Sequence, residues 1–175
     1  MPHRIFLIIE SLLIVFLGIG LQTEAQAQQL RKCLFVASYH QGYAWQDGLE
    51  RGLRSVLEGK CEIRQFNMDT KRNPSHEFGK KMALEAKARI ESWKPDIVIA
   101  SDDNASKYLV APYFKDAKLP FVFCGINWTA KEYGYPYSNA TGMIEVFPIK
   151  QLIKQIKRII PNAKTAVFVR GDRLS

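Results

Sequence analysis

Residues 95–105 read PDIVIASDDNA. Pro95 ends the helical pattern before it, and the apolar run 97–100 has the length of a short strand. An uninterrupted apolar run of this kind suits a strand that is buried on both faces, which is typical of parallel sheets. The polar residues 101–104 follow at once. This stretch therefore predicts a central strand of an α/β sheet.

Strand-like and helix-like segments alternate on both sides of this stretch. Strands are predicted at 33–38, 61–68, 96–100, 120–126, 141–146 and 164–169. Helices are predicted where apolar residues recur at helical spacing, at 45–57, 78–93, 104–114 and 149–160. This alternation indicates βαβ units, and right-handed crossovers place helices on both faces. The predicted fold class is α/β, with a doubly wound, mostly parallel sheet.

Residues 1–27 contain the three parts of a cleavable secretory signal. Arg4 gives a basic start, residues 5–21 are almost wholly apolar, and Ala25-Gln26-Ala27 has the small-x-small cleavage pattern. We expect export, with membrane contact only through this segment. The alternative is an uncleaved anchor helix, but the uninterrupted run 12–21 is short against the roughly 20 residues that span a bilayer.

Export would place the three cysteines in an oxidising compartment, which permits one disulfide and leaves one thiol over. Cys33 and Cys61 each open a predicted strand and could be neighbours, so a Cys33–Cys61 disulfide is a hypothesis. Cys124 lies in an apolar run and is interpreted as a small buried hydrophobe. The absence of C-x-x-C spacing excludes a zinc ribbon or a thioredoxin-type motif.

Hydroxyl, amide, carboxylate and aromatic side chains follow the predicted strands. In open α/β sheets, ligands bind beyond the carboxyl ends of the strands, near the point where the strand order reverses. The candidate ligand-binding residues at these ends are Ser38, Tyr39, Tyr43, Trp45, Asp69, Asp102, Asn104, Gly125, Asn127 and Trp128. Aromatic walls with a few polar groups suit a small polar or zwitterionic ligand that has an apolar part.

Each candidate also has a structural interpretation. One of residues 102–104 is expected to cap the following helix, which leaves the helix N–H groups facing the cleft. Tyr43 and Trp45 are equally consistent with a hydrophobic staple between the first helix and the sheet. Asp69 is followed by two basic residues and is consistent with an ordinary solvated turn.

Common enzyme and cofactor motifs are missing. The chain has no G-x-G-x-x-G, G-x-x-x-x-G-K-[ST], H-E-x-x-H or G-x-S-x-G, so we predict a non-enzyme without cofactor or metal. The alternative is a hydrolase that pairs carboxylates among Asp69, Asp102, Asp103 and Glu145. The net charge of +8 is spread over predicted helix faces, which favours a solvated surface over a nucleic-acid interface.

Four blocks of the sequence resemble bacterial ABC-transporter substrate-binding proteins of the tryptophan/tyrosine type. The blocks are VASYHQGYAW (36–45), FNMDTKR (66–72), PDIVIASDDNA (95–105) and PFVFCGIN (120–127). The resemblance runs from about residue 33 to the end of the chain. It implies a type I periplasmic-binding fold, in which two lobes close on a ligand in the cleft between them, and a periplasmic or secreted location.

This resemblance implies a division of the chain and a function. Residues 28–146 would form the first ligand-binding lobe, and 147–175 a crossover helix and the first strand of an incomplete second lobe. The chain would capture a small polar or amino-acid-like ligand for an ABC permease. The apolar stripe of 149–160 would normally pack partly against the missing lobe and is expected to be exposed here.

The blocks at 68–72 and 101–105 also look like extracytoplasmic sensor domains of bacterial histidine kinases and cyclic-dinucleotide enzymes. The alternative function is therefore a ligand-sensing module whose partner is a membrane sensor protein. In either role, closure of two lobes on the ligand would be the signal that the partner detects.

Overall fold

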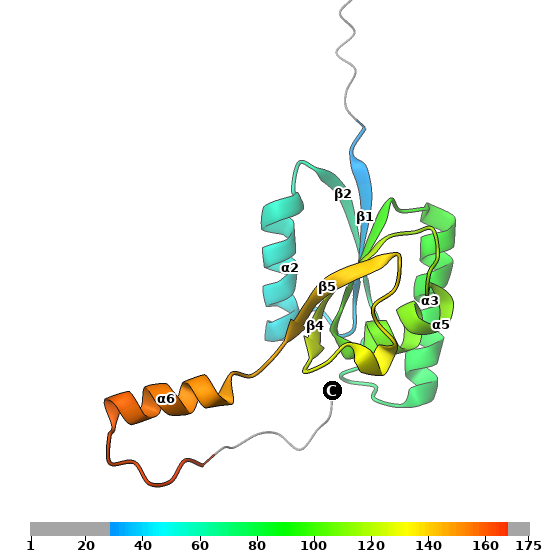
Figure 1. Ribbon diagram of the computed structural model, residues 1–175. Coiled ribbons are helices and arrows are strands. Elements are labelled where there is room, and N and C mark those ends of the chain that lie inside the picture. Colours follow the sequence, from blue (N-terminus) through cyan, green and yellow to red (C-terminus); the bar gives the residue numbers. More distant parts are fainter. Residues whose placement is uncertain (1–28, 168–175) are drawn as a thin grey trace, which may run out of the picture.

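Strands and helices alternate in the computed structural model, which describes residues 29–167 (Figure 1). The strands are β1 (Arg31–Ala37), β2 (Cys61–Asn67), β3 (Ile97–Ser101), β4 (Phe121–Asn127) and β5 (Ala140–Glu145). The main helices are α2 (Ala44–Leu57), α3 (His76–Trp93) and α6 (Ile149–Ile159). A continuous helical segment after β3 comprises α4 (Asp102–Ala105), the π-helical η1 (Ser106–Val110) and α5 (Ala111–Tyr113), and η2 (Lys131–Tyr133) is a 3₁₀ turn. The predicted secretory signal lies outside the described residues.

The five strands form one sheet in the order β2-β1-β3-β4-β5, and all neighbouring strands are parallel. The chain passes from β1 outward to β2 and then returns to β3 on the other side of β1. The carboxyl ends of β1 and β3 therefore flank the point where the strand order reverses, which is where open α/β sheets bind ligands. The predicted α/β class with a doubly wound parallel sheet is confirmed.

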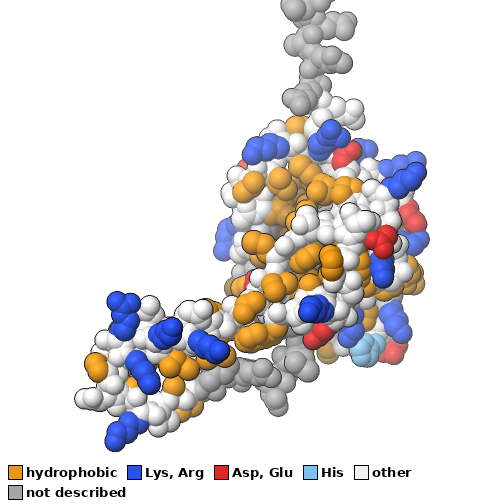
Figure 2. All heavy atoms as spheres, in the orientation of Figure 1, with side chains coloured by type: hydrophobic (Ala, Val, Ile, Leu, Met, Phe, Trp, Pro, Cys, Tyr) orange, Lys and Arg blue, Asp and Glu red, His pale blue; other side chains and the backbone are white. Residues whose placement is uncertain are grey.

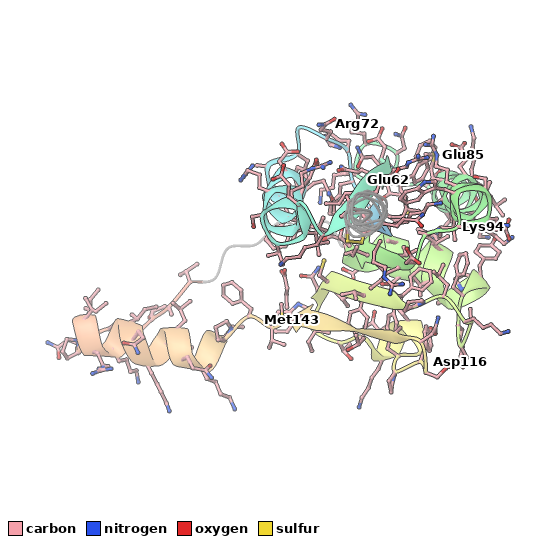
Figure 3. All side chains as sticks on the ribbon, turned by 90° about the horizontal axis from the view of Figure 1, so that it is seen from above. Glu62, Arg72, Glu85, Lys94, Asp116 and Met143 are labelled. Carbon is pink, nitrogen blue, oxygen red and sulfur yellow. A yellow bond between two sulfur atoms is a disulfide. The ribbon has the colours of Figure 1, made fainter. Side chains whose placement is uncertain are left out.

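Helices cover both faces of the sheet, with α2 on one side and α3 on the other (Figures 1 and 3). Side chains of β1 alternate between the two layers, because successive residues of a strand point to opposite faces. Leu34 and Val36 belong to the core under α3, whereas Cys33 and Phe35 belong to the core under α2. Both sets are buried, as a central parallel strand requires.

The helix after β3 begins differently from the prediction. Ser101 is the N-cap residue, and its side chain makes no capping hydrogen bond. Instead, the backbone N–H of Ala105 donates to Oγ of Ser38 at 2.8 Å. The prediction that one of residues 102–104 caps this helix was therefore wrong. A residue 67 positions away in the chain supplies the acceptor, and local capping preferences carry no information about such a partner.

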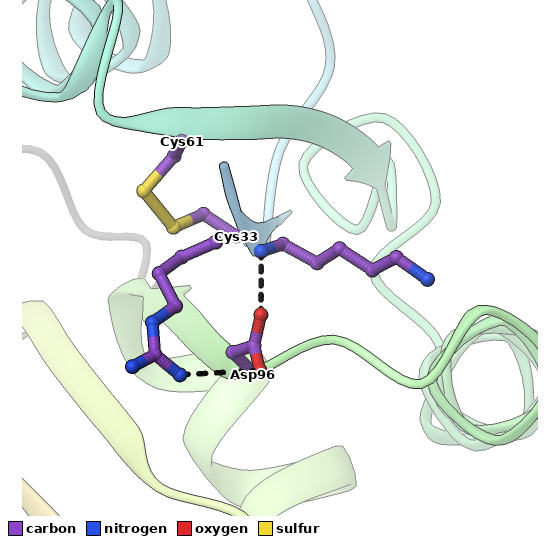
Figure 4. The surroundings of a disulfide bond; sticks show 5 residues. Cys33, Cys61 and Asp96 are labelled. Carbon is purple, nitrogen blue, oxygen red and sulfur yellow. Dashed lines mark hydrogen bonds and ion pairs between the residues drawn. A yellow bond between two sulfur atoms is a disulfide. The ribbon is translucent and has the colours of Figure 1, made fainter. Parts of the chain in front are cut away.

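A disulfide joins Cys33 of β1 to Cys61 of β2, with the two Cα atoms 5.8 Å apart (Figure 4). Next to it, the carboxylate of Asp96 accepts a 2.7 Å hydrogen bond from the backbone N–H of Lys32, which ties the start of β3 to β1. Cys124 is free and only half-buried, and burial raises the pKa of its thiol to about 11. The thiol is therefore protonated at neutral pH.

Helix α6 extends away from the rest of the molecule (Figure 1). None of its residues is buried, and Leu152 and Ile153 are 45% and 39% exposed, so its apolar stripe is exposed as expected. Residues 164–167 form no strand, and the remainder of the strand predicted at 164–169 lies outside the described residues. Between residues 29 and 167, no helix is long and apolar enough to cross a membrane.

Candidate functional site

Polar side chains gather at the carboxyl edge of the sheet. β3 ends at Ser101, and Asp102 and Asp103 begin α4 without an intervening loop. β4 ends at Asn127, which pairs in register with Glu145 at the end of β5. Because the strands are parallel, these groups lie along one edge, as the sequence predicted.

Ser38 connects the ends of β1 and β3 from a fully buried position. Its hydroxyl donates to the carbonyl oxygen of Ser101 at 2.6 Å, and its carbonyl oxygen accepts from Oγ1 of Thr70 at 2.7 Å. Thr70 Oγ1 in turn accepts from Nδ2 of Asn104 at 2.9 Å. Ser38 was predicted to face the ligand, but in this structure its hydroxyl is 0% exposed and holds the backbone of the site. Thr70 was not among the predicted site residues.

Asp102 is a buried carboxyl group, 2% exposed. Trp45 donates from Nε1 to Oδ1 of Asp102 at 3.1 Å, whereas Oδ2 has no partner among the described residues. Burial of Asp102 away from water raises its pKa to about 7. The hydrogen bond from Trp45 lowers this pKa, whereas the nearby carboxylates of Asp103 and Glu145 raise it. The carboxyl group of Asp102 therefore changes from its protonated to its charged form near neutral pH.

Gly125 makes room for Asp102. Its φ angle is +72°, a backbone conformation that residues other than glycine rarely adopt. A Cβ atom at this position would also lie 3.1 Å from Oδ1 of Asp102. The predicted site residue Gly125 is therefore required for backbone geometry and for the close approach of the carboxyl group.

Asp103 joins the two loops beside the site. Its Oδ2 accepts from Nδ2 of Asn127 at 2.9 Å, and its Oδ1 accepts from the hydroxyl of Tyr133 at 2.8 Å. Burial raises the pKa of Tyr133, and the hydrogen bond to Asp103 adds to this, so the phenol stays a donor. Neither Asp103 nor Tyr133 was among the predicted ligand-binding residues, although the hydrolase alternative included Asp103. Asp103 lies next to one that was, whereas Tyr133 comes from a loop with no periodic pattern.

An open cavity of about 500 Å³ lies against these residues. It is lined by Asp103, Asn104, Lys107, Ala111, Asn127, Trp128, Glu132 and Tyr133. Three predicted residues line it, namely Asn104, Asn127 and Trp128, and the indole of Trp128 is 52% exposed. The lining combines two carboxylates, one ammonium group, two amides and two aromatic rings.

The other predicted residues form a separate cluster after β1 and β2. The rings of Tyr39 and Tyr43 pack edge to face with centroids 5.4 Å apart, and the ammonium group of Lys71 lies 5.1 Å from the Tyr39 centroid. Arg72 donates to both carboxylate oxygens of Asp69, and this hydrogen bonding lowers the pKa of Asp69. These residues do not line the cavity. The carboxylate of Asp69 is 22% exposed and also accepts a 3.2 Å hydrogen bond from Nδ2 of Asn73.

Within the described part of the chain, no group of three or more His, Cys, Asp or Glu residues is placed to hold a metal ion.

Comparisons with known proteins give the fold alone. No protein-family model and no curated protein matches the chain. Among solved structures, the chain is similar to a conserved domain protein from Vibrio cholerae O1 biovar eltor str. N16961, with a TM-score of 0.50 and 19% sequence identity. The match covers 75% of this chain and 45% of that chain, so this chain spans less than half of the neighbour's length.

Proposed function

We propose that the chain contains the first lobe of an exported solute-binding protein, which captures a small zwitterionic ligand for an ABC permease. The observation that carries this proposal is the mixed lining of the cavity at the carboxyl edge of the sheet. The four sequence blocks that resemble ABC-transporter substrate-binding proteins support it. The Cys33–Cys61 disulfide also supports export, because disulfides persist in oxidising compartments.

The charges of the cavity suit an amino-acid-like ligand. Asp103 and Glu132 offer carboxylates to an ammonium group, and Lys107 offers an ammonium group to a carboxylate. Trp128 offers an apolar wall to a side chain. No Ser, Cys or His side chain lines the cavity, so among the described residues it lacks the common nucleophile–histidine pair.

Thermal melting of the full chain with three sets of small molecules tests this function. The sets are amino acids, amines that lack the carboxyl group, and carboxylic acids that lack the amine. We expect amino acids to raise the melting temperature most, because a ligand that binds only the native state stabilises it. Asp103→Asn and Lys107→Gln should each abolish the difference between the sets. Lys81→Gln, on the exposed surface of α3, is the matched control. Equal shifts for all three sets, or none, would contradict the proposal.

The second candidate is a ligand-sensing module, favoured by the blocks at 68–72 and 101–105. Both functions use the same cavity, so ligand binding does not separate them. The genomic sequence around the coding region does. Neighbouring permease and ATPase genes support transport, whereas a following transmembrane helix with a signalling domain supports sensing.

A further inference from the structure

Lys107 supplies the ammonium group of the cavity lining and follows the carboxylate of Asp103 by four residues. Opposite charges at this spacing on a helix normally attract each other and pair. Yet Lys107 forms no ion pair with any residue between 29 and 167. Its Nζ atom lies 5.1 Å from the ring centroid of Tyr108, within the roughly 6 Å over which a cation is attracted to the face of a ring. The partner of this ammonium group is therefore an aromatic ring rather than a carboxylate.

The ring of Tyr108 is itself held in place against α3. Tyr108 is 8% exposed, and its phenol oxygen lies 2.6 Å from Nδ1 of His76, which is a hydrogen-bonding distance. Gly79 of α3 lets the ring approach the helix, because a Cβ atom there would lie only 2.6 Å from Cε2 of Tyr108. A ring fixed in this way gives the cation on it a defined position, although Lys107 is an exposed residue.

The carboxylate of Asp103 is held separately, by the hydrogen bonds from Tyr133 and Asn127. A carboxylate has about four acceptor positions, so Asp103 can also accept from the ammonium group of a ligand. Lys107 and Tyr108 both belong to the π-helical turn η1, a rare conformation that is frequently found at functional sites. The two opposite charges of the cavity wall thus have different partners, each with its own support.

We propose that Tyr108 is a positioning residue of the ligand cavity. Its ring holds the ammonium group of Lys107 apart from Asp103, so that the cation and the carboxylate can receive the opposite ends of one zwitterion. An ion pair between Lys107 and Asp103 would occupy both charges, and a ligand would first have to break it. Groups that are already in place cost less to order when a ligand binds. This inference rests on the proposed function and assigns to Tyr108 the preference for a ligand that carries a carboxylate.

Nuclear magnetic resonance of the full chain tests the position of Lys107 without a ligand. Protons over the face of an aromatic ring resonate upfield. We therefore expect an upfield ε-methylene signal, assigned to Lys107 by its loss in Lys107→Gln. Tyr108→Phe should keep the upfield shift, because a phenyl face also attracts cations, and Tyr108→Leu should abolish it. An ordinary lysine shift for Lys107 in the unmodified chain would overturn the proposal.

Thermal melting then tests selectivity, with amino acids and the amines that lack the carboxyl group as probes. In the unmodified chain and in Tyr108→Phe, we expect amino acids to raise the melting temperature more than the amines do. In Tyr108→Leu this difference should fall several-fold, whereas the shifts caused by the amines should stay the same. Phe66→Leu is the matched control, because it shortens another buried ring of the same core and should keep the difference. A role in folding alone would lower the melting temperature of both variants and leave the difference between probes unchanged.

The outcomes separate this inference from the proposed function. A difference between probes that survives Tyr108→Leu, or that Phe66→Leu also removes, would overturn this inference alone. Equal shifts for all probes in the unmodified chain would overturn the proposed function and this inference together. If Tyr108→Leu does not fold, Gly79→Ala takes its place, because the added methyl group must displace the Tyr108 ring. It should reduce the same difference, and an unchanged difference in that variant would overturn the inference as well.

Discussion

The two faces of the sheet differ in how completely they are covered. On the α3 side, Val36, Val98, Leu109 and Phe121 are almost completely buried, together with Tyr135 from the loop after β4. On the α2 side, the buried set is small: Cys33, Phe35, Ala37 and Ile99. The side chains that α2 places against it are only partly buried. One parallel sheet thus has a closed core on one face and an open groove on the other, because α2 leaves Val122, Cys124 and Met143 lining an open groove there (Figure 2).

The largest loss of stability is expected when a buried side chain on the α3 face is shortened. Leu109→Ala removes a side chain that is 0% exposed, and we expect a loss of about 4 kcal/mol in the free energy of unfolding. The matched change Leu53→Ala on the α2 face should cost about 1 kcal/mol, because that side chain is half-buried and borders the groove. Urea unfolding at constant pH measures both. Equal losses would mean that the groove is filled in solution.

The disulfide is expected to stabilise the α2 face, where the buried core is small. The bridge closes a loop of 28 residues, and removing it with Cys33→Ser and Cys61→Ser should cost about 3 kcal/mol. Urea unfolding of the non-reduced protein is the measurement, and Cys124→Ser is the control with an intact bridge. A loss no greater than that of the control would show that the bridge contributes nothing to the open face.

Asp102 allows the carboxyl edge to be tested separately from both faces. Its folded-state pKa of about 7 lies above the ordinary 3.8, so the native state binds its proton more tightly than the unfolded chain does. Its contribution to stability therefore falls as the pH rises from 4 to 7 and is constant above that. We expect Asp102→Asn to be more stable than the unmodified chain by about 2 kcal/mol at pH 8, with the difference vanishing near pH 4.

Urea unfolding at pH 4, 6 and 8 checks this dependence. Asp116→Asn is the comparison of opposite sign, because hydrogen bonds from Ser138 lower the pKa of Asp116 and stabilise its charged form. That contribution is lost as the pH falls, so this variant should be destabilised at pH 8. A difference for Asp102→Asn that is the same at all three pH values would show that the buried carboxyl group is not the cause.

The smallest effect is expected for Met143→Ser in the groove. This side chain is 75% exposed, so the change should alter the free energy of unfolding of a monomer by less than about 0.5 kcal/mol. Urea unfolding is the measurement. A large loss of monomer stability would mean that the groove side chains are already packed within one chain.

Features that depend on neighbours in the sequence were predictable, and features that depend on distant partners were not. The apolar run 97–100 gave the central strand, and helical spacing gave α2 and α3 to within two residues. The edge of the sheet that collects polar groups followed from parallel topology. The predicted N-cap of α4 was wrong because the backbone N–H of Ala105 donates to Ser38, which is distant in the sequence. Tyr133 was missed because its partner Asp103 lies 30 residues earlier.

The direct passage from β3 to α4 has a consequence for molecular recognition. Ser101 is the last residue of the strand and Asp102 the first of the helix, so no flexible turn separates the sheet from Asp103. A binding group that is already held in place loses little conformational entropy when a ligand arrives. The part of the site that contains Asp103 is therefore preorganised for binding. Differences in affinity between ligands should report their direct contacts with it rather than the ordering of the backbone.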